Sequence, residues 1–421
     1  MSNLHHVIYQ SYLQLMHDFC QYPRLTELLR AEGLSPRAHV LGIGKAAWKM
    51  ASLCAGILRQ RGIGHDGYVL TKYGHSHGEL PSLSILEAAH PIPDPSAINA
   101  SRVVVDWLKG LPKEEDLIIL LSGGSSALFE MLPGSVSLQE FTDITSQLLK
   151  SGKDIAAINR RRKEISLLKG GKALALTPSR RVYVYAVSDV GGNDPRVIGS
   201  GPFTPPEGGA RENDSWHYEM SGKDIRYRVV ADNHLFCRQF TESLAKQGLD
   251  ASFDGQFQAC PVARFSAQLK ELLRRAHHPR FRLKPPFIRV FGGELTLEVK
   301  GGGKGGRCSH LALSMTNPLS KFENAALFCF ATDGSDNIAG SGGACVDSHT
   351  RSELRQAGID VTRSKRDHDS YTALKAIHKI IPSPVLATNV NDVFVLSVGY
   401  DLENPVNCNS LDEPDLFAGM L

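Results

Sequence analysis

The chain has 421 residues, 42% of them hydrophobic, so it is long enough to bury more than one core, and two α/β domains are expected. A formal net charge of +3 is too small to indicate a nucleic-acid partner, so basic residues that matter should act singly in a pocket. The eight cysteines form no zinc-like spacing, the first residues show no leader pattern, and no stretch approaches the roughly 18 apolar residues of a membrane span. We therefore expect a soluble, cytoplasmic protein that contacts neither membrane nor nucleic acid.

The first strong signal is a strand, a glycine turn and a helix over residues 38–47, which follow two expected helices at 7–31. The turn resembles a dinucleotide fingerprint, but the acidic residue that should end the second strand is missing, because Asp66 falls before the next apolar run, residues 68–70. Lys45 stands at the first turn of the helix, where a cation opposes the helix dipole unless an anion lies beside it. We interpret Lys45 as a phosphate-binding lysine rather than a solvated one, and its spacing excludes a Walker A loop.

A proline-rich loop at residues 90–96 follows the next strand and precedes a helix from about Ala97. Asp94 or Ser96 can cap that helix. His90 is a candidate for a substrate pocket, and the alternative is a histidine that is hydrogen-bonded within its own loop.

The run from Asp116 to Leu128 organises the chain. Its five aliphatic residues predict a strand that is buried on both faces, followed by a small, hydroxyl-rich loop and a helix. In Ser122-Gly123-Gly124-Ser125-Ser126 the glycines allow close approach of the backbone, and the N–H groups and hydroxyls favour an anion such as phosphate. The alternative is a turn that needs glycine only for its geometry.

A capping box, Ser137 with Glu140, opens a helix that is expected to run to about Lys150. The basic run at 159–172 is usually typical of a solvated helix face. Its Gly170-Gly171 pair, between Lys169 and Lys172, is also compatible with a polyphosphate tail.

A third apolar strand, residues 181–187, ends in a glycine turn that contains Asp189 and Asp194. Carboxylates at this end of a sheet strand are typical of metal ligands and catalytic bases, with turn-capping aspartates as the alternative. Residues 205–224 are polar and are interpreted as a surface excursion. The basic, proline-containing stretch 274–286 is interpreted as the boundary between domains 1–280 and 281–421.

The second half opens with an expected strand, turn and strand over residues 287–299. The glycine-dense segment 301–306 then leads into a helix from about Ser309 to Leu319. Arg307 stands at the start of this helix and, like Lys45, is expected to have an anion beside it. The alternative interpretation of the glycine-dense segment is a flexible linker. Further strands are expected at 325–331 and 393–398, with a helix at 371–381 between them.

Ten motifs in this order resemble those of the glycerate 2-kinase family, which is also known under hydroxypyruvate reductase names, over residues 7–400. The motifs are Gly42-Ile43-Gly44-Lys45-Ala46, His90-Pro91-Ile92-Pro93-Asp94, Ser122 to Leu128, Lys169-Gly170-Gly171, Ser188-Asp189-Val190, Ser200-Gly201-Pro202, Gly292-Gly293-Glu294, Gly305-Gly306-Arg307, Thr332-Asp333-Gly334 and Thr388 to Asp392. The resemblance implies an α/β protein of two domains, a Rossmann-like N-terminal domain with a parallel sheet and a smaller C-terminal domain, with the active site in the cleft between them. It also implies phosphorylation of the 2-hydroxyl of D-glycerate with ATP and Mg²⁺.

The motifs and the resemblance together nominate the site residues. Lys45 and Arg307 are the expected catalytic cations, and Asp189 is expected to hold magnesium, with Asp194, or to accept the hydroxyl proton. The candidates for nucleotide and phosphate binding are Gly44, Ser122, Gly123, Gly124, Ser125, Ser126, Lys169, Gly305 and Gly306. The candidates for substrate binding are His90, Arg162, Glu294, Asp333 and Asn389.

Several polar positions differ from the family's usual pattern, and the substrate therefore stays open. They are Glu164, Asn193, Cys308, Ser309, His310, Gly340 and residues 384–387. The alternatives are a kinase for another small hydroxy acid, a ligand-binding protein without activity and, less favoured, an NAD(P)H-dependent reductase. A serine hydrolase fits poorly, because Ala127 breaks the GxSxG pattern. The sequence leaves a homodimer open.

Overall fold

The computed structural model describes residues 4–150, 160, 162–205, 209–278, 280, 284–338, 340–382, 388–401 and 408, without the side chains of residues 145–150. The chain forms two compact units. The eight-strand unit comprises Tyr22–Asp232 and Ala387–Asn389, and the six-strand unit comprises Met1–Gln21, Asn233–Leu386 and Val390–Leu421. Residues 384–387, which differ from the usual pattern of the family, lie outside the described residues.

The sheet of the eight-strand unit has the order β3-β2-β1-β4-β5-β8-β7-β6. Its strands are β1 (Arg37–Ile43), β2 (Gly64–Lys72), β3 (Leu83–Ala88), β4 (Asp116–Leu121), β5 (Arg181–Val187), β6 (Ala210–Glu212), β7 (Ser215–Met220) and β8 (Lys223–Ala231). The six strands from β3 to β8 in this order pair in parallel. Every residue of β4 is buried, as its aliphatic run predicts.

The sheet is mixed rather than wholly parallel, because β6 and β7 pair antiparallel at one edge. These strands occupy the stretch that was expected to be a surface excursion, and that expectation is wrong. Trp216 and Tyr218 of β7 are buried while His217 and Glu219 are exposed, which is the alternation of a strand with one covered face. Ser221 and Gly222, both with positive φ, form the tight turn from β7 into β8.

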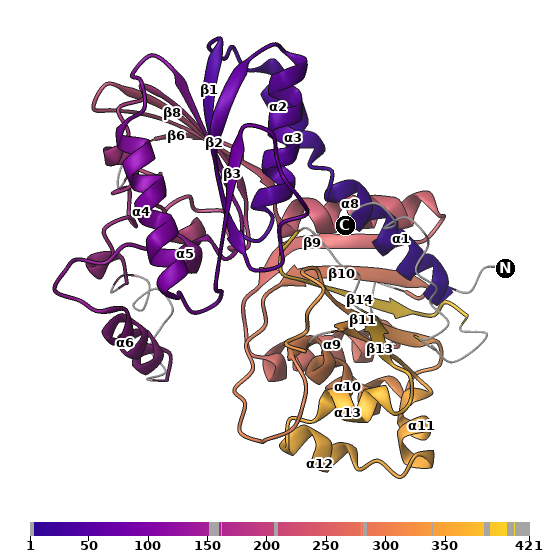
Figure 1. The fold of residues 1–421 in the computed structure, drawn as a ribbon. Helices are drawn as coiled ribbons and strands as arrows, with labels where there is room; N and C mark the ends of the chain where they lie inside the picture. Colours follow the sequence, from indigo (N-terminus) through magenta and orange to yellow (C-terminus); the bar gives the residue numbers. More distant parts are fainter. Residues whose placement is uncertain are drawn as a thin grey trace. The chain divides into compact units, whose positions relative to one another are not determined.

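Helices cover both faces of this sheet, with α2 (Pro23–Ala31) and α3 (Ala47–Gln60) on one face and α4 (Pro95–Lys109) on the other (Figure 1). The expected inward face of α3, including Met50 and Cys54, is buried. Asp94 caps α4 by accepting a hydrogen bond from Ala97 N at 2.9 Å. The short α5 (Ser125–Leu128) follows β4, and the capping box of Ser137 and Glu140 opens α6 (Leu138–Lys150).

The six-strand unit has the sheet order β13-β12-β11-β14-β10-β9. Its strands are β9 (Ala251–Gln258), β10 (Phe287–Gly293), β11 (Ala325–Ala331), β12 (Ser341–Asp347), β13 (Ile380–Pro382) and β14 (Asp392–Val398). Its helices are α1 (Leu4–Phe19), α8 (Asn233–Lys246), α9 (Val262–Ala276), α10 (Arg307–Leu319), α11 (Thr350–Gln356), α12 (Val361–Arg366) and α13 (Ser370–Lys375). Helices α1 and α8 lie on one face of the sheet, and α9 and α10 lie on the other (Figure 1).

These units differ from the expected ranges 1–280 and 281–421. Residues 233–276 pack with the later strands, because β9 pairs in parallel with β10 and is hydrogen-bonded into the same sheet. Two expected elements are also different. Residues 295–299 form no strand beyond a bridge at Thr296, and the expected helix at 371–381 stops at Lys375, before β13.

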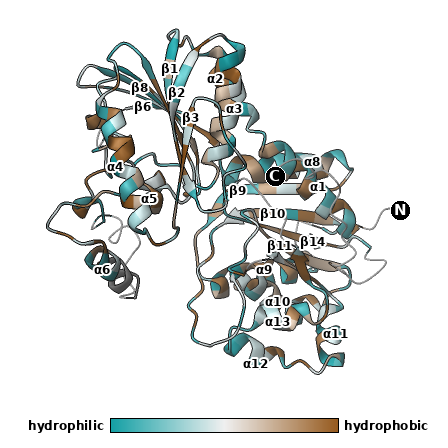
Figure 2. Cartoon of the chain, viewed as in Figure 1, coloured by the Kyte–Doolittle hydropathy of each residue, from teal (hydrophilic) through white to brown (hydrophobic). Residues whose placement is uncertain are grey.

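Each unit has its own buried cluster of aliphatic and aromatic side chains. Hydrophobic residues are concentrated along strands such as β3 and β11, and α12 is largely hydrophilic (Figure 2). Across the described residues, no helix has both the length and the apolar character needed to cross a membrane.

A buried ion pair is a sensitive point of the six-strand unit. Lys379 is 0% exposed and lies 3.3 Å from Asp347 Oδ2 and 2.8 Å from Glu353 Oε2. We expect Lys379→Met to lower the free energy of unfolding by about 3–5 kcal/mol, because Asp347 would remain buried without its cation. Urea denaturation measures the loss. The exposed Lys321→Met serves as the control, and a loss below about 1 kcal/mol for Lys379→Met would contradict the expectation.

Candidate active site

Four parallel strands of the eight-strand unit carry candidate residues just beyond their carboxyl ends. Lys45 follows β1, His90 follows β3, Ser122 follows β4 and Asp189 follows β5. Because these strands belong to the parallel part of one sheet, their carboxyl ends share one edge, where α/β proteins bind their ligands.

Lys45 is fixed beside the loop Ser122–Ser126 by backbone contacts. Its N–H donates to Gly123 O at 2.9 Å, and the N–H of Ala46 donates to Ser122 Oγ at 3.1 Å. Gly44 has φ of 126°, and a Cβ there would lie 2.2 Å from Ser122 Oγ. Only glycine therefore allows the two turns to approach so closely.

The two glycines of the loop bring three further candidates together beside Lys45. A Cβ on Gly123 would lie 2.8 Å from Asp189 Oδ2 and 3.0 Å from Asn389 Nδ2. A Cβ on Gly124 would lie 3.0 Å from His90 Cδ2 and 3.4 Å from Lys45 Cγ. The absence of side chains at 123 and 124 thus makes room for a carboxylate, an amide, an imidazole and a lysine around one loop.

The serines of the loop have different surroundings. Ser126 Oγ lies 3.0 Å from Ser200 Oγ, in the Ser200-Gly201-Pro202 motif. Ser125 is buried against Gly199, where a Cβ would lie 2.3 Å from Ser125 Oγ. Ser122 Oγ is engaged with the N–H of Ala46. Ser126 also lines a pocket beside the loop.

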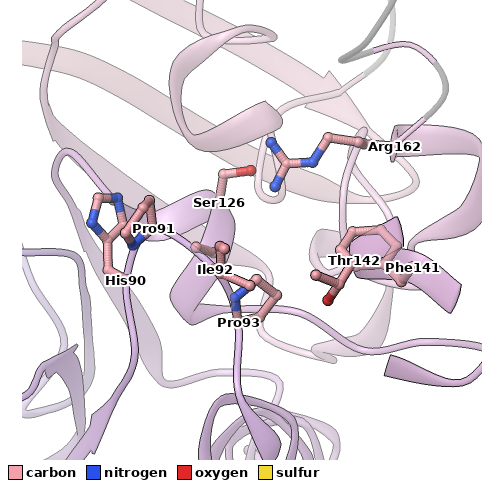
Figure 3. A pocket seen from close by; sticks show the side chains of 10 residues that line it. His90, Pro91, Ile92, Pro93, Ser126, Phe141, Thr142 and Arg162 are labelled. Carbon is pink, nitrogen blue, oxygen red and sulfur yellow. The ribbon is translucent and has the colours of Figure 1, made fainter. Parts of the chain in front are cut away.

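A pocket of about 440 Å³ opens beside the loop (Figure 3). Its walls are apolar along Pro91, Ile92, Pro93, Ala127 and Phe141. The polar lining consists of His90, Gly124, Ser126, Thr142 and Arg162. No carboxylate is among these lining residues, so the pocket suits an anion that also carries a small apolar surface.

Arg162 supplies the positive charge of this pocket. Its guanidinium points toward the Ser126 hydroxyl in Figure 3, and it lies 6.0 Å from the centre of the Phe141 ring. Its Nε is buried without a hydrogen-bond partner among the described residues. Burial lowers the pKa of Arg162, and the nearby carboxylate of Glu130 opposes this shift. An acidic ligand would satisfy such a group.

Lys169 lies elsewhere than expected for a phosphate-binding residue. Its side chain is 1% exposed and pairs with Glu130, which is 0% exposed. Burial lowers the pKa of Lys169 to about 8, and Glu130 opposes the shift. The ammonium is therefore committed to a carboxylate inside the core and is not presented to a ligand.

The sequence reasoning missed Glu130, Phe141 and Thr142. A signal for Glu130 existed, since it is a single carboxylate in the otherwise apolar run from Ala127 to Leu132, where a buried charge requires a partner. Phe141 and Thr142 carried no chemical signal, because their contribution is a position on α6.

The two candidate metal ligands have different surroundings. Asp194 accepts two hydrogen bonds from Arg196 Nε, at 3.0 and 3.2 Å, and one from Nη2 at 2.8 Å. These bonds to Arg196 lower the pKa of Asp194 and occupy both of its oxygens. Asn193 donates to Asp214 and Asp232, so an amide separates these carboxylates. No group of three or more His, Cys, Asp or Glu residues in the described part of the chain is arranged to hold a metal.

In the six-strand unit, Arg307 is held by carboxylates of the same unit. Its Nε lies 2.5 Å from Asp392 Oδ2, and its Nη1 lies 2.9 Å from Glu294 Oε1. Burial lowers the pKa of Arg307, but Asp392 and Glu294 raise it by more, and the net shift is upward. The guanidinium is therefore a fixed cation.

The backbone N–H groups at the start of α10 also have a hydrogen-bond acceptor within the protein. Asp336 accepts hydrogen bonds from the N–H groups of Cys308, at 2.9 Å, and Ser309, at 2.8 Å. A Cβ on Gly306 would lie 2.2 Å from Asp336 Oδ1, and one on Gly305 would lie 2.1 Å from Ser370 Oγ. Asp336 therefore caps the start of α10, and Gly306 makes room for its carboxylate while Gly305 makes room for Ser370.

Two other residues have local roles in this unit. Asp333 accepts a hydrogen bond from Ser335 N at 3.0 Å. His310, one of the departures, stacks on His368 with ring centres 5.1 Å apart, and burial lowers its pKa to about 4.

Comparisons with known proteins place this geometry in context. Residues 14–217 match the domain of unknown function DUF4147, and residues 287–392 match the MOFRL family. A D-glycerate 2-kinase from Thermotoga maritima is 32% identical over 85% of this chain and 90% of its own length. A glycerate 2-kinase from Pyrococcus horikoshii is 32% identical over 86% and 87%, and a putative hydroxypyruvate reductase from Agrobacterium vitis is 28% identical over 86% and 100%.

Solved structures agree with these matches. A crystal structure of glycerate kinase from Thermotoga maritima has a TM-score of 0.79 at 30% identity and covers 93% of this chain and 99% of its own. The crystal structure of a protein from Pyrococcus horikoshii has a TM-score of 0.73 at 26% identity and covers 95% of this chain and 100% of its own.

The contact between the two turns at Gly44 can be tested by adding one methyl group. We expect Gly44→Ala to cost more than about 3 kcal/mol, because backbone strain and steric overlap with Ser122 add. Gly62→Ala is the matched control, since Gly62 also has positive φ but has nothing within 4 Å of a Cβ, and it should cost only about 1–2 kcal/mol. Urea denaturation compares the two. Equal losses would show that the loop does not depend on this contact.

Proposed function

Because the chain belongs to the glycerate kinase family, we propose that it transfers the γ-phosphate of ATP to the 2-hydroxyl of D-glycerate, which gives 2-phosphoglycerate and ADP. The observation that carries the proposal is the convergence of Lys45, His90, Asp189 and Asn389 on the Ser122–Ser126 loop, next to a pocket whose charge comes from Arg162. Another small 2-hydroxy acid is the alternative substrate.

In this proposal Arg162 binds the carboxylate of the acid. A planar guanidinium matches a carboxylate with two parallel hydrogen bonds, and the apolar walls of the pocket strengthen that attraction by excluding water. The Ser126 hydroxyl and His90 lie on the same pocket and would contact the hydroxyl groups of the acid.

Phosphoryl transfer needs alignment of the reactants and positive charge on the migrating group. The glycine loop supplies backbone N–H groups without side chains in the way, and Lys45 beside it supplies a cation. The order β3-β2-β1-β4-β5 with a glycine turn after β1 is also that of doubly wound nucleotide-binding sheets, which supports a Rossmann-like assignment for this unit.

Asp189 is the residue that would hold Mg²⁺ or accept the proton of the substrate hydroxyl. Because Gly123 has no side chain, Asp189 Oδ2 can lie close to the loop that is proposed to bind phosphate, which is compatible with either role. A single carboxylate is sufficient for Mg²⁺, which commonly takes one or two carboxylates and completes its shell with phosphate oxygens and water. When bound, the metal would neutralise charge on the phosphates.

Arg307 is retained as a second catalytic cation. The support is its place in the Gly305-Gly306-Arg307 motif and the two carboxylates that fix its guanidinium within its own unit. The proposed site does not include Lys169 or Asp194, because Lys169 already pairs with Glu130 and Asp194 with Arg196.

A reductase reading has less support, although a relative carries that name. Asp66 pairs with Arg37 and His39 rather than standing at the end of β2 to meet a ribose, and β2 ends in Lys72. Oxidation of NADH by hydroxypyruvate, followed at 340 nm, would reveal that activity.

The first test of the kinase proposal is Lys45→Ala. We expect turnover with ATP, Mg²⁺ and D-glycerate to fall by on the order of 10²-fold or more, because a cation on the transferring group is lost. ADP release measured with a coupled assay gives the rate, and Lys109→Ala, an exposed lysine at the end of α4, is the control. Unchanged turnover would remove Lys45 from the mechanism.

The second test is Arg162→Gln. We expect the KM for D-glycerate to rise by roughly 10- to 100-fold, the effect of losing a charged hydrogen bond, while the KM for ATP stays constant. Steady-state kinetics with each substrate varied in turn separates the two constants. A rise in the KM for ATP instead would place Arg162 at the nucleotide.

A further inference from the structure

Three charged side chains lie close together, and one of them, Arg162, lines the pocket. Glu130, after α5, and Lys169 are both fully buried, and Arg162 is partly buried with its guanidinium on the pocket. Each interacts electrostatically with the other two. There is thus one carboxylate for two cations, and these three side chains together carry one net positive charge.

The carboxylate of Glu130 is fully used by partners other than Arg162. Its Oε2 pairs with Lys169 Nζ, and its Oε1 accepts from Ser166 Oγ at 2.5 Å and from Met131 N at 3.0 Å. In the described structure no hydrogen bond or ion pair joins Glu130 to Arg162, and Arg162 Nε has no partner. Glu130 attracts Arg162 electrostatically, but its pairing with Lys169 keeps its carboxylate from forming an ion pair with Arg162.

The Lys169-Gly170-Gly171 motif fits this role. Gly170 and Gly171 both have positive φ, 65° and 84°, and their N–H groups donate to Ser200 O at 3.0 Å and Gly201 O at 2.7 Å. Ser166 Oγ accepts from Lys169 N at 3.3 Å. These contacts turn the chain so that Lys169 points into the core toward Glu130, and the same Ser200 contacts Ser126 of the loop.

Resting on the proposed function, we propose that Lys169 is a positioning residue that holds Glu130 away from Arg162 and so keeps the Arg162 guanidinium available to the carboxylate of the substrate. A buried carboxylate without a cation is strongly unfavourable. If the lysine is removed, Glu130 turns to Arg162, and the pocket loses its net positive charge.

The experiment compares two variants that break the same ion pair from opposite sides. In Lys169→Met the free carboxylate captures Arg162, so the KM for D-glycerate should rise at least about 10-fold while the KM for ATP stays constant. In Glu130→Gln no carboxylate remains to compete, so the KM for D-glycerate should stay within about 3-fold of wild type. The double variant Lys169→Met/Glu130→Gln should also return to that range. Lys169→Arg, which keeps the charge, should do the same.

Calorimetric titration of D-glycerate into each protein gives a readout that does not depend on turnover. The proposal is overturned if Lys169→Met and Glu130→Gln raise the KM and weaken binding to the same extent, as a purely structural pair would require. A 10-fold rise in Glu130→Gln alone overturns it even if Lys169→Met does not fold. Lys379→Met, which breaks a buried pair in the other unit, should lower stability without changing the KM for D-glycerate.

Failure of the proposed function would look different. If wild-type protein neither binds nor phosphorylates D-glycerate, the kinase assignment fails. If wild type does both and the two single variants behave alike, only the role of Lys169 fails.

Discussion

The site depends on how closely two turns of one sheet approach each other. Strands β1 and β4 are parallel neighbours, and Lys45 N donates to Gly123 O where both strands have just ended. This contact is possible because Gly44 leaves no Cβ to strike Ser122. Asp189, Asn389 and His90 then lie against the glycines of the same loop, so the geometry of the site follows from backbone pairing and not from flexible side chains.

Local patterns in the sequence predicted the elements that carry this site. Long apolar runs bounded by glycine identified β1, β4 and β5, and capping residues identified α4 and α6, because both signals are set by neighbours along the chain. The division of the chain was not predictable in this way. Residues 233–276 join the six-strand unit through the pairing of β9 with β10, which are nearly thirty residues apart. The sequence of neither strand indicates which other strand it will pair with.

The charges of the site were predicted in kind but not in detail. A cation at the start of a helix is expected to have an anion beside it, and Arg307 has anions beside it. They are Asp392 and Glu294, with Asp336 on the helix amides. Lys169 has Glu130 in the same sense. A pattern can show that a charge needs a partner, but whether that partner is a ligand or a distant side chain depends on the fold.

The distribution of carboxylates therefore decides what each cation can do. Asp194 is bound to Arg196 and Glu130 to Lys169, so these two cations are neutralised within the protein. The lining of the pocket contains no carboxylate, and Arg162 retains an unsatisfied Nε there. A buried guanidinium is unfavourable unless it is paired, so the binding of an anion would offset the free-energy cost of burying Arg162. In the proposed function, the carboxylate of the acid is that anion, and this would link the packing of the core to the choice of substrate.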